Sequence, residues 1–134
     1  MSTLKIDNIN ELTTASGINC TAKSVYNSKD KINNVTPSAG VLTVDYTLGQ
    51  LVDVNWNANI TDIALNNFPA GGSMTMYLVQ DATGGRTVTF PASFKAAGGT
   101  APTMSFGVNQ YDILVITSKD GVNFDYGLFG ANFS

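Results

Sequence analysis

The chain has 134 residues, of which 43% are apolar and only 13% are charged, and its formal net charge is −3. This length is typical of one domain with one core, and the charged fraction is about half of the roughly 25% of an average soluble domain. The seven basic residues form no long run, so nucleic acid is not an expected partner, because phosphate backbones bind to concentrated basic patches.

No stretch of the sequence approaches the ~18 consecutive apolar residues of a membrane-spanning helix, so no membrane partner is expected. The first seven residues, MSTLKID, lack the apolar core of a signal peptide. We therefore expect the protein to be made in a cytosol.

Residues 1–38 differ from the rest of the chain, because their large apolar side chains are few and isolated among Thr, Asn, Ser and Lys. Ordering such a segment costs more free energy than so few apolar groups return by burial. We therefore predict an extended arm over residues 1–38 that docks on another surface. Its interface candidates are Leu4, Ile6, Ile9 and Leu12.

Residues 39–134 have the regular alternation and turn signals of β structure and are predicted to form one module. The predicted strands are 41–48, 53–61, 62–68, 73–80, 86–90, a short strand at Phe94, a further short strand within 102–108, 110–118 and 122–130. Asp120-Gly121 is a hairpin signal between the last two. Eight or nine strands at this spacing predict an all-β fold: an antiparallel β-sandwich or jelly-roll-like domain of about eight strands.

The stretch from Asp53 to Thr61 alternates most clearly. Trp56, the only tryptophan, falls on its apolar face, and the opposite face carries a polar row made of Asp53, Asn55, Asn57 and Asn59. One dry and one wet face predict a strand of an antiparallel sheet. The phase slips at Thr61-Asp62, which predicts a β-bulge or a bend between sheets.

The polar row resembles the start of a calcium loop, but a loop of that kind needs Gly at its sixth position and Glu at its twelfth. Those positions hold Ala58 and Ala64. Side chains along one strand also lie in a line, so they do not surround an ion without help from another segment. We therefore predict no metal site, and interpret the row as a hydrogen-bonding surface or an interface.

Catalytic machinery is not apparent in the sequence. The chain has no histidine, which removes Ser-His-Asp and Cys-His mechanisms and leaves the single cysteine, Cys20, without a base to activate it. Glu11 is the only glutamate, and Asp45, Asp53 and Asp112 are spread over separate strands. We expect neither an enzyme nor a cofactor; an Asp-pair hydrolase is the enzymatic alternative.

Residues 80–133 resemble a module of tailed-bacteriophage virion proteins. The resemblance is carried by Gln80-Asp81, by the run Thr83-Gly84-Gly85-Arg86-Thr87-Val88-Thr89-Phe90-Pro91, by Gly98-Gly99 with Pro102-Thr103, by Asp112 and by Asp120-Gly121. Residues 41–56 resemble the first half of the same module, and residues 2–19 resemble a short segment of phage tail fibres. The resemblance implies a trimeric β-structure that serves as a tail-fibre part or a capsid decoration protein, with no catalytic residues.

The leading hypothesis from the sequence is a non-enzymatic virion structural protein, made in the host cytoplasm, that binds and stabilises the assembled head as a capsid decoration (cement) protein. The short distance between arm and module favours this reading over a complete fibre. Its expected partners are itself, as a homotrimer, and the major capsid protein or tail proteins. The alternative is a tail-fibre or receptor-binding module, for which a carbohydrate ligand predicts exposed aromatic side chains beside the polar row.

Overall fold

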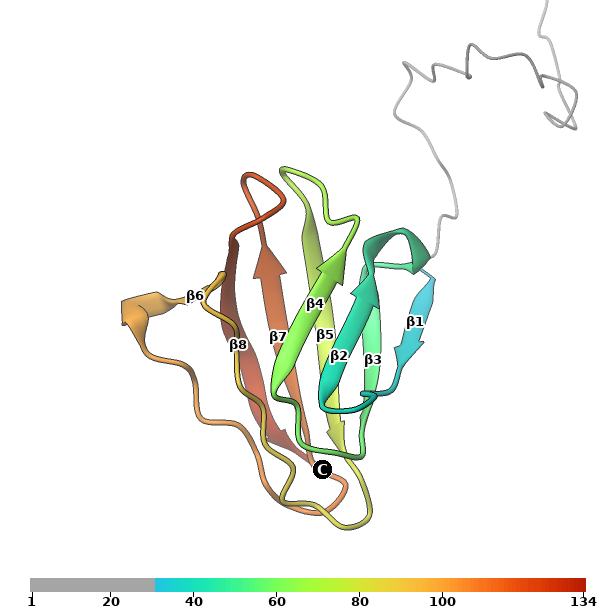
Figure 1. Ribbon diagram of the computed structural model, residues 1–134. Helices are drawn as coiled ribbons and strands as arrows, with labels where there is room; N and C mark the ends of the chain where they lie inside the picture. The colour runs from blue at the N-terminus through green and yellow to red at the C-terminus, as the bar shows by residue number, and fades with distance from the viewer. Residues whose placement is uncertain (1–30) are drawn as a thin grey trace, which may run out of the picture.

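The computed structural model describes residues 31–134, which form an almost purely β structure (Figure 1). The arm candidates Leu4, Ile6, Ile9 and Leu12, and also Cys20, lie outside the described residues. The strands are β1 (Ile32–Val35), β2 (Val41–Asp45), β3 (Leu51–Trp56), β4 (Asp62–Asn66), β5 (Ser73–Gln80), β6 (Phe94–Ala96), β7 (Tyr111–Thr117) and β8 (Phe124–Phe133), with three-ten turns η1 (Tyr46–Leu48) and η2 (Ala97–Gly99). The predicted all-β fold of about eight strands is confirmed. No helix in this part of the chain is long and apolar enough to cross a membrane.

The strands form two unequal sheets that face each other. The larger sheet has the order β1-β3-β5-β7-β8-β6, and the smaller consists of β2 and β4, which lie in front of it in Figure 1. From β1 to β5 the chain alternates between the sheets, so that β1, β3 and β5 run parallel in one and β2 and β4 run parallel in the other. Residues 57–61 carry the chain from β3 to β4, so the strand that was predicted to reach Thr61 ends at Trp56, and the predicted phase slip at Thr61-Asp62 falls at the start of β4.

The direction of β3 differs from the prediction. Both neighbours of β3 are parallel to it, whereas the antiparallel pairs are β5–β7 and β7–β8. A parallel sheet usually has helices on both faces, so its strands have no solvent-exposed face, and for this reason an alternating strand favours an antiparallel sheet. Here the crossovers are strands of the small sheet, which cover only one face, so the alternating pattern of β3 is compatible with parallel pairing.

The core lies between the two sheets. Val52, Val54 and Trp56 from β3 are fully buried there, together with Leu42 and Val44 from β2. Met74, Met76 and Leu78 of β5 and Leu114 and Ile116 of β7 complete its centre, and Phe94, Phe124 and Tyr126 close one end. The predicted dry face of the Trp56 strand is thus the inner face of the large sheet.

The sheet begins earlier than the boundary predicted between arm and module. Residues 32–35, which the sequence pattern assigned to the arm ending at residue 38, form the edge strand β1 and pair with Leu51–Val54. Asn33 of β1 is buried and its Nδ2 donates to the carbonyl of Asp45 at 3.2 Å. A truncation that leaves the sheet intact therefore has to stop before Ile32.

Two segments predicted as strands are loops, and buried side chains take part of their backbone hydrogen bonds. In the 86–90 segment, Gln80 Nε2 donates to the carbonyl of Arg86 and Gln80 Oε1 accepts from its N–H, at 2.8 and 2.9 Å. In the 102–108 segment, the N–H of Ser105 donates to Asp112 and its carbonyl accepts from Gln80. Only an isolated bridge from Val88 to Ile60 remains of the first predicted strand.

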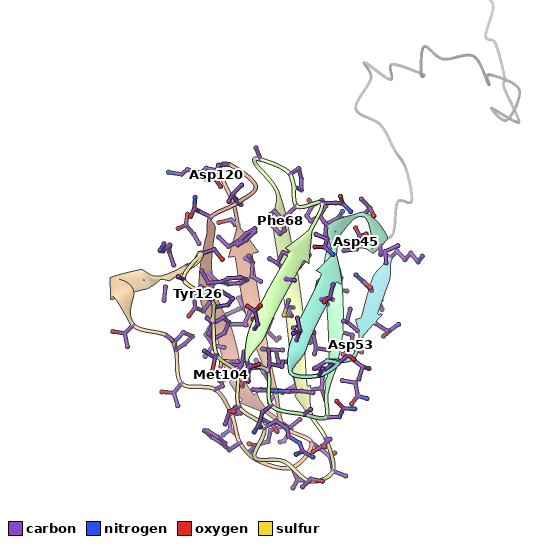
Figure 2. The ribbon with its side chains drawn as sticks, viewed as in Figure 1. Asp45, Asp53, Phe68, Met104, Asp120 and Tyr126 are labelled. Atoms are coloured by element: carbon purple, nitrogen blue, oxygen red, sulfur yellow. The ribbon has the colours of Figure 1, made fainter. Side chains whose placement is uncertain are left out.

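The hairpin signal at Asp120-Gly121 is confirmed, since β7 and β8 pair in antiparallel fashion on either side of it. The Asp120 carboxylate accepts from the side chain and backbone N–H of Asn123, both at 2.7 Å, and from the backbone N–H of Val122 at 2.8 Å. Gly121 adopts a φ of 79°, and the carbonyl of Phe68 lies 2.7 Å from where its Cβ would stand. Val122, at the start of the predicted strand 122–130, lies in the turn and is exposed. Asp120 marks this turn in Figure 2.

Replacing Asp120 by asparagine is expected to destabilise the protein only where the native carboxyl is ionised. Hydrogen bonds from the Asn123 side chain, then from the backbone N–H groups of Asn123 and Val122, hold the pKa of Asp120 below its usual range. A depressed pKa contributes stability that is present above the unfolded pKa of about 4 and is lost as the pH falls through the folded pKa. Urea unfolding at pH 7, 4 and 2 should show a difference between wild type and Asp120→Asn that shrinks with acidification. A constant difference would mean that the charge is irrelevant.

A candidate binding surface on the open face of the sheet

The face of the large sheet that points away from the core is not covered by any other strand among residues 31–134 (Figure 1). We call it the open face. Successive side chains of a strand point to opposite faces of the sheet. The residues of β3, β5 and β7 that flank the core positions therefore lie on the open face. These are Ile32, Asn34, Leu51, Asp53, Asn55, Thr75, Tyr77, Val79, Tyr111, Ile113, Val115 and Phe133.

Three aromatic rings lie side by side on the open face. The Tyr77 and Tyr111 ring centroids are 6.0 Å apart, and the rings of Tyr111 and Phe133 stack at 5.0 Å with an interplanar angle of 18°. Strand register places Tyr111 opposite Phe133 on β8 and opposite Val79 on β5. We call Tyr77, Tyr111 and Phe133 the aromatic row.

A glycine and a β-bulge allow Phe133 to reach this position. A Cβ on Gly130 would come within 2.6 Å of the Phe133 ring, so only glycine lets the ring lie flat on its own strand. The pairing of β7 and β8 shifts register between Ile113 and Leu114, and an extra residue of this kind re-aims the side chains that follow. Phe129, at the irregularity, is the most exposed large apolar side chain of residues 31–134.

Two adjoining hollows lie beside the aromatic row. One, of about 280 Å³, is lined by Ile32, Leu51, Asp53, Tyr77, Val79 and Tyr111. The second, of about 260 Å³, is lined by Asn34, Val35, Thr36, Asp53, Asn55 and Val79. Because Asp53 and Val79 line both, the hollows form one shallow groove that crosses β1, β3, β5 and β7. Each is slightly smaller than a usual small-molecule pocket.

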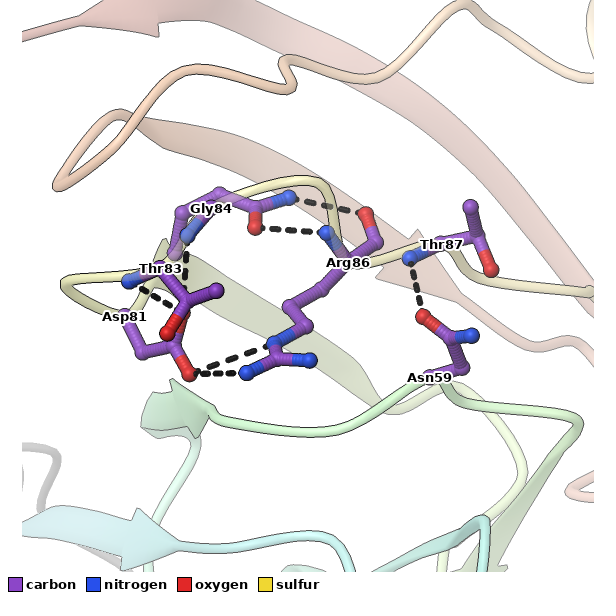
Figure 3. Close-up of polar contacts among 7 residues, drawn as sticks. Asn59, Asp81, Thr83, Gly84, Arg86 and Thr87 are labelled. Atoms are coloured by element: carbon purple, nitrogen blue, oxygen red, sulfur yellow. Dashed lines mark hydrogen bonds and ion pairs between the residues drawn. The ribbon is translucent and has the colours of Figure 1, made fainter.

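The structure divides the predicted polar row. Asp53 and Asn55 lie on the open face, where Asp53 is opposite Tyr77 and Asn55 is opposite Val79. Asn57 and Asn59 follow the end of β3, and Asn59 Oδ1 accepts from the backbone N–H of Thr87 at 3.1 Å (Figure 3). The role of the row as an interface between copies stays a prediction.

Asp53 is exposed on the open face. Within residues 31–134 its carboxylate makes no hydrogen bond or ion pair, although it lies between the two hollows. The ion pair among these residues joins Arg86 to Asp81 at 2.7 Å, and the Arg86 side chain, with the N–H groups of Gly84 and Thr83, holds the pKa of Asp81 below its usual range (Figure 3). The same residues contain no cluster of three or more His, Cys, Asp or Glu that would suit a metal ion.

The aromatic row was missed in the sequence. The 73–80 segment reads as apolar almost throughout, so its faces were not assigned, although Met74, Met76 and Leu78 share one period-2 face and leave Tyr77 on the other. That Tyr111 and Phe133 join Tyr77 depends on strand register, which local sequence does not encode.

Comparison with known proteins identifies a family. The model of a protein family described as "Putative phage tail fibre C-terminal domain" matches residues 35–119, from the last residue of β1 to the turn after β7. No curated protein and no solved structure matches the chain.

Proposed function

We propose that this chain, which belongs to the phage tail fibre C-terminal domain family, serves as a non-enzymatic structural module of a phage tail fibre. The observation that carries this proposal is the family match, since it spans β2 to β7 and so includes most of both sheets. Membership makes the chain a phage structural protein and a virion component, and the tail is the more specific location that we infer from it.

The tail is preferred to the head, although the sequence favoured a capsid decoration protein. That preference rested on the short distance between arm and module, whereas the family is named for tail fibres. No feature of residues 31–134 favours attachment to a capsid over attachment within a fibre.

The proposed homotrimer is assembled through residues 1–30, with Leu4, Ile6, Ile9 and Leu12 as contacts between copies. Residues 31–134 already enclose a core, so the large sheet needs no partner to fold. Light scattering on the purified chain measures the number of copies, and a chain that begins at Lys31 is expected to be a folded monomer.

A non-enzymatic role is supported by the chemistry of the described side chains. Asp45 is engaged with Thr47 and Asn67, Asp81 with Arg86, and Asp112 with Ser105, so these carboxylates hold loops in place. Asp53 faces the open groove without a second carboxylate among its lining residues, as a two-carboxylate hydrolase would need.

Labelling of intact virions tests the location. Gold-conjugated antibodies against residues 31–134 are expected to bind at the tail, and electron microscopy of negatively stained particles reads their position. Antibodies against the major capsid protein serve as the control for head labelling. Labels confined to the head would reject the tail-fibre proposal in favour of capsid decoration.

A further inference from the structure

We propose that the groove on the open face binds a neutral saccharide, with the aromatic row as the stacking surface and with Asp53, Asn55 and Asn34 as hydrogen-bonding groups. The inference rests on the proposed function in one respect, which is that a fibre module presents this face to the outside of the particle. It adds a ligand class and a site to a module otherwise understood as structural.

The stacking surface consists of side chains that the core does not use. Tyr77 and Tyr111 line the larger hollow, and Phe133 stacks behind Tyr111 on the side of β8. An aromatic ring offers a flat apolar surface, and the hydroxyl of tyrosine adds a polar end that stays wet. The C–H face of a pyranose ring is likewise flat and apolar, with hydroxyl groups around its edge, so the two surfaces are complementary.

The polar groups line both parts of the groove: Asp53 borders both hollows, and Asn34 and Asn55 line the second one. Asp53 is opposite Tyr77 across the β3–β5 ladder and opposite Asn34 across the β1–β3 ladder. A carboxylate offers several acceptor positions, and an asparagine side chain both donates and accepts. Sugar hydroxyls need this mixture, because each one donates one hydrogen bond and accepts others.

Charge decides between neutral and anionic ligands. Among residues 31–134, no lysine or arginine lines either hollow, and Asp53 supplies the only carboxylate there. A phosphate, a sulfate or an acidic sugar would meet an unopposed carboxylate, with no cation to compensate it. The groove therefore favours an uncharged glycan.

The dimensions suit a short stretch of glycan. The groove crosses four strands, which spans about 14 Å at the usual spacing between strands. This length exceeds a single pyranose ring, and the hollows are shallow, so the ligand is expected to lie across the sheet with one side in solvent. Such contacts predict weak binding by one copy, strengthened when several copies bind one surface.

A glycan array tests the proposal directly. The full chain, fluorescently labelled, is applied to an array of neutral and acidic glycans, and each neutral ligand found is titrated into ¹⁵N-labelled full chain by NMR. Chemical-shift changes are expected at Asp53, Asn55, Tyr77 and Tyr111. Tyr77→Ala and Tyr111→Ala should each weaken binding at least tenfold, whereas Tyr111→Phe, which keeps the ring, should change it by less than threefold.

Matched variants separate binding from folding. Phe106→Ala removes an exposed aromatic ring outside the groove and should leave the affinity unchanged. Asn55→Lys changes an exposed position, so this variant should fold normally, and its lysine side chain should block the groove. It therefore tests the site even if an alanine variant at Tyr77 or Tyr111 proves unstable.

Three results would overturn the inference. They are no glycan bound on the array, binding of acidic glycans alone, and a self-association that Asn55→Lys abolishes, which would show that a second copy covers the open face. Virion labelling is independent of all three. A tail location without glycan binding rejects only the saccharide site, and glycan binding with a head location rejects only the tail-fibre proposal.

Discussion

Replacement of Trp56 by alanine is expected to lower the free energy of unfolding by about 3–5 kcal/mol. Trp56 is fully buried at the end of β3, in the core between the two sheets. Removing its indole leaves a cavity that the parallel ladders on both sides of β3 restrict from collapsing. Urea unfolding, followed by circular dichroism because the fluorescent residue is lost, measures the change.

A matched pair of variants tests whether volume explains this loss. Trp56→Phe keeps an aromatic ring, and among residues 31–134 the Trp56 Nε1 donates to no acceptor, so phenylalanine breaks no hydrogen bond within that part of the chain. Its cost should be clearly smaller than that of alanine. Asn57→Ala, one residue further and exposed, should change stability by less than about 0.5 kcal/mol. A stable Trp56→Ala protein would mean that the two faces of β3 are reversed.

Replacement of Asp112 by alanine is expected to cost about 3 kcal/mol and to loosen the 102–108 segment. The Asp112 carboxylate is fully buried and accepts from the backbone N–H of Ser105 at 2.7 Å and of Asn132 at 3.0 Å, as well as from the Ser105 hydroxyl. The backbone N–H of Ser105 loses its acceptor in this variant, and a buried donor left without a partner costs about 1–3 kcal/mol, whereas the N–H of Asn132 keeps the Ser105 hydroxyl oxygen as an acceptor at 2.8 Å. Urea unfolding measures the total, and hydrogen exchange at Ser105 and Asn132 shows where the structure opens.

Two controls locate this effect at the hydrogen bonds. Asp112→Asn keeps one acceptor oxygen and should have an intermediate stability. Asp53→Ala removes an exposed carboxylate that has no partner within residues 31–134, so its stability should stay within about 0.5 kcal/mol of wild type. Unchanged exchange at Ser105 in Asp112→Ala would show that the loop is held by other contacts.

Much of the fold follows from local pattern. Period-2 alternation placed Trp56 on the dry face and Asp53 on the wet face, and the structure agrees at both positions. Strand direction did not follow, because an alternating strand reads the same whether its neighbours are parallel or antiparallel. The difference lies in the crossover through β2 and β4, which depends on contacts between distant segments.

The segments at 86–90 and 102–108 show a second limit of sequence reasoning. Their alternation is as regular as that of true strands, but Gln80 and Asp112 bond to their backbones from inside the core. Which backbone groups a buried polar side chain bonds to depends on which segments lie beside it in three dimensions, and local sequence does not show this. The candidate site has the same origin, since Tyr77, Tyr111 and Phe133 are brought together only by register across β5, β7 and β8.

The alternation of the chain between two sheets also has a consequence for how the protein folds. Within residues 31–134, only β7 and β8 are consecutive in the chain among the paired strands, whereas Ile32 pairs with Leu51, Val41 with Asp62 and Leu51 with Thr75. To form any of these ladders, the chain must first close a loop between the two strands. Conformational entropy is therefore lost before the first hydrogen bond of the ladder forms. Topologies rich in such non-local pairs fold in milliseconds to seconds. Among residues 31–134, the hairpin at Asp120-Gly121 is the one pairing available without that delay, and it is where ordering of the unfolded chain can begin.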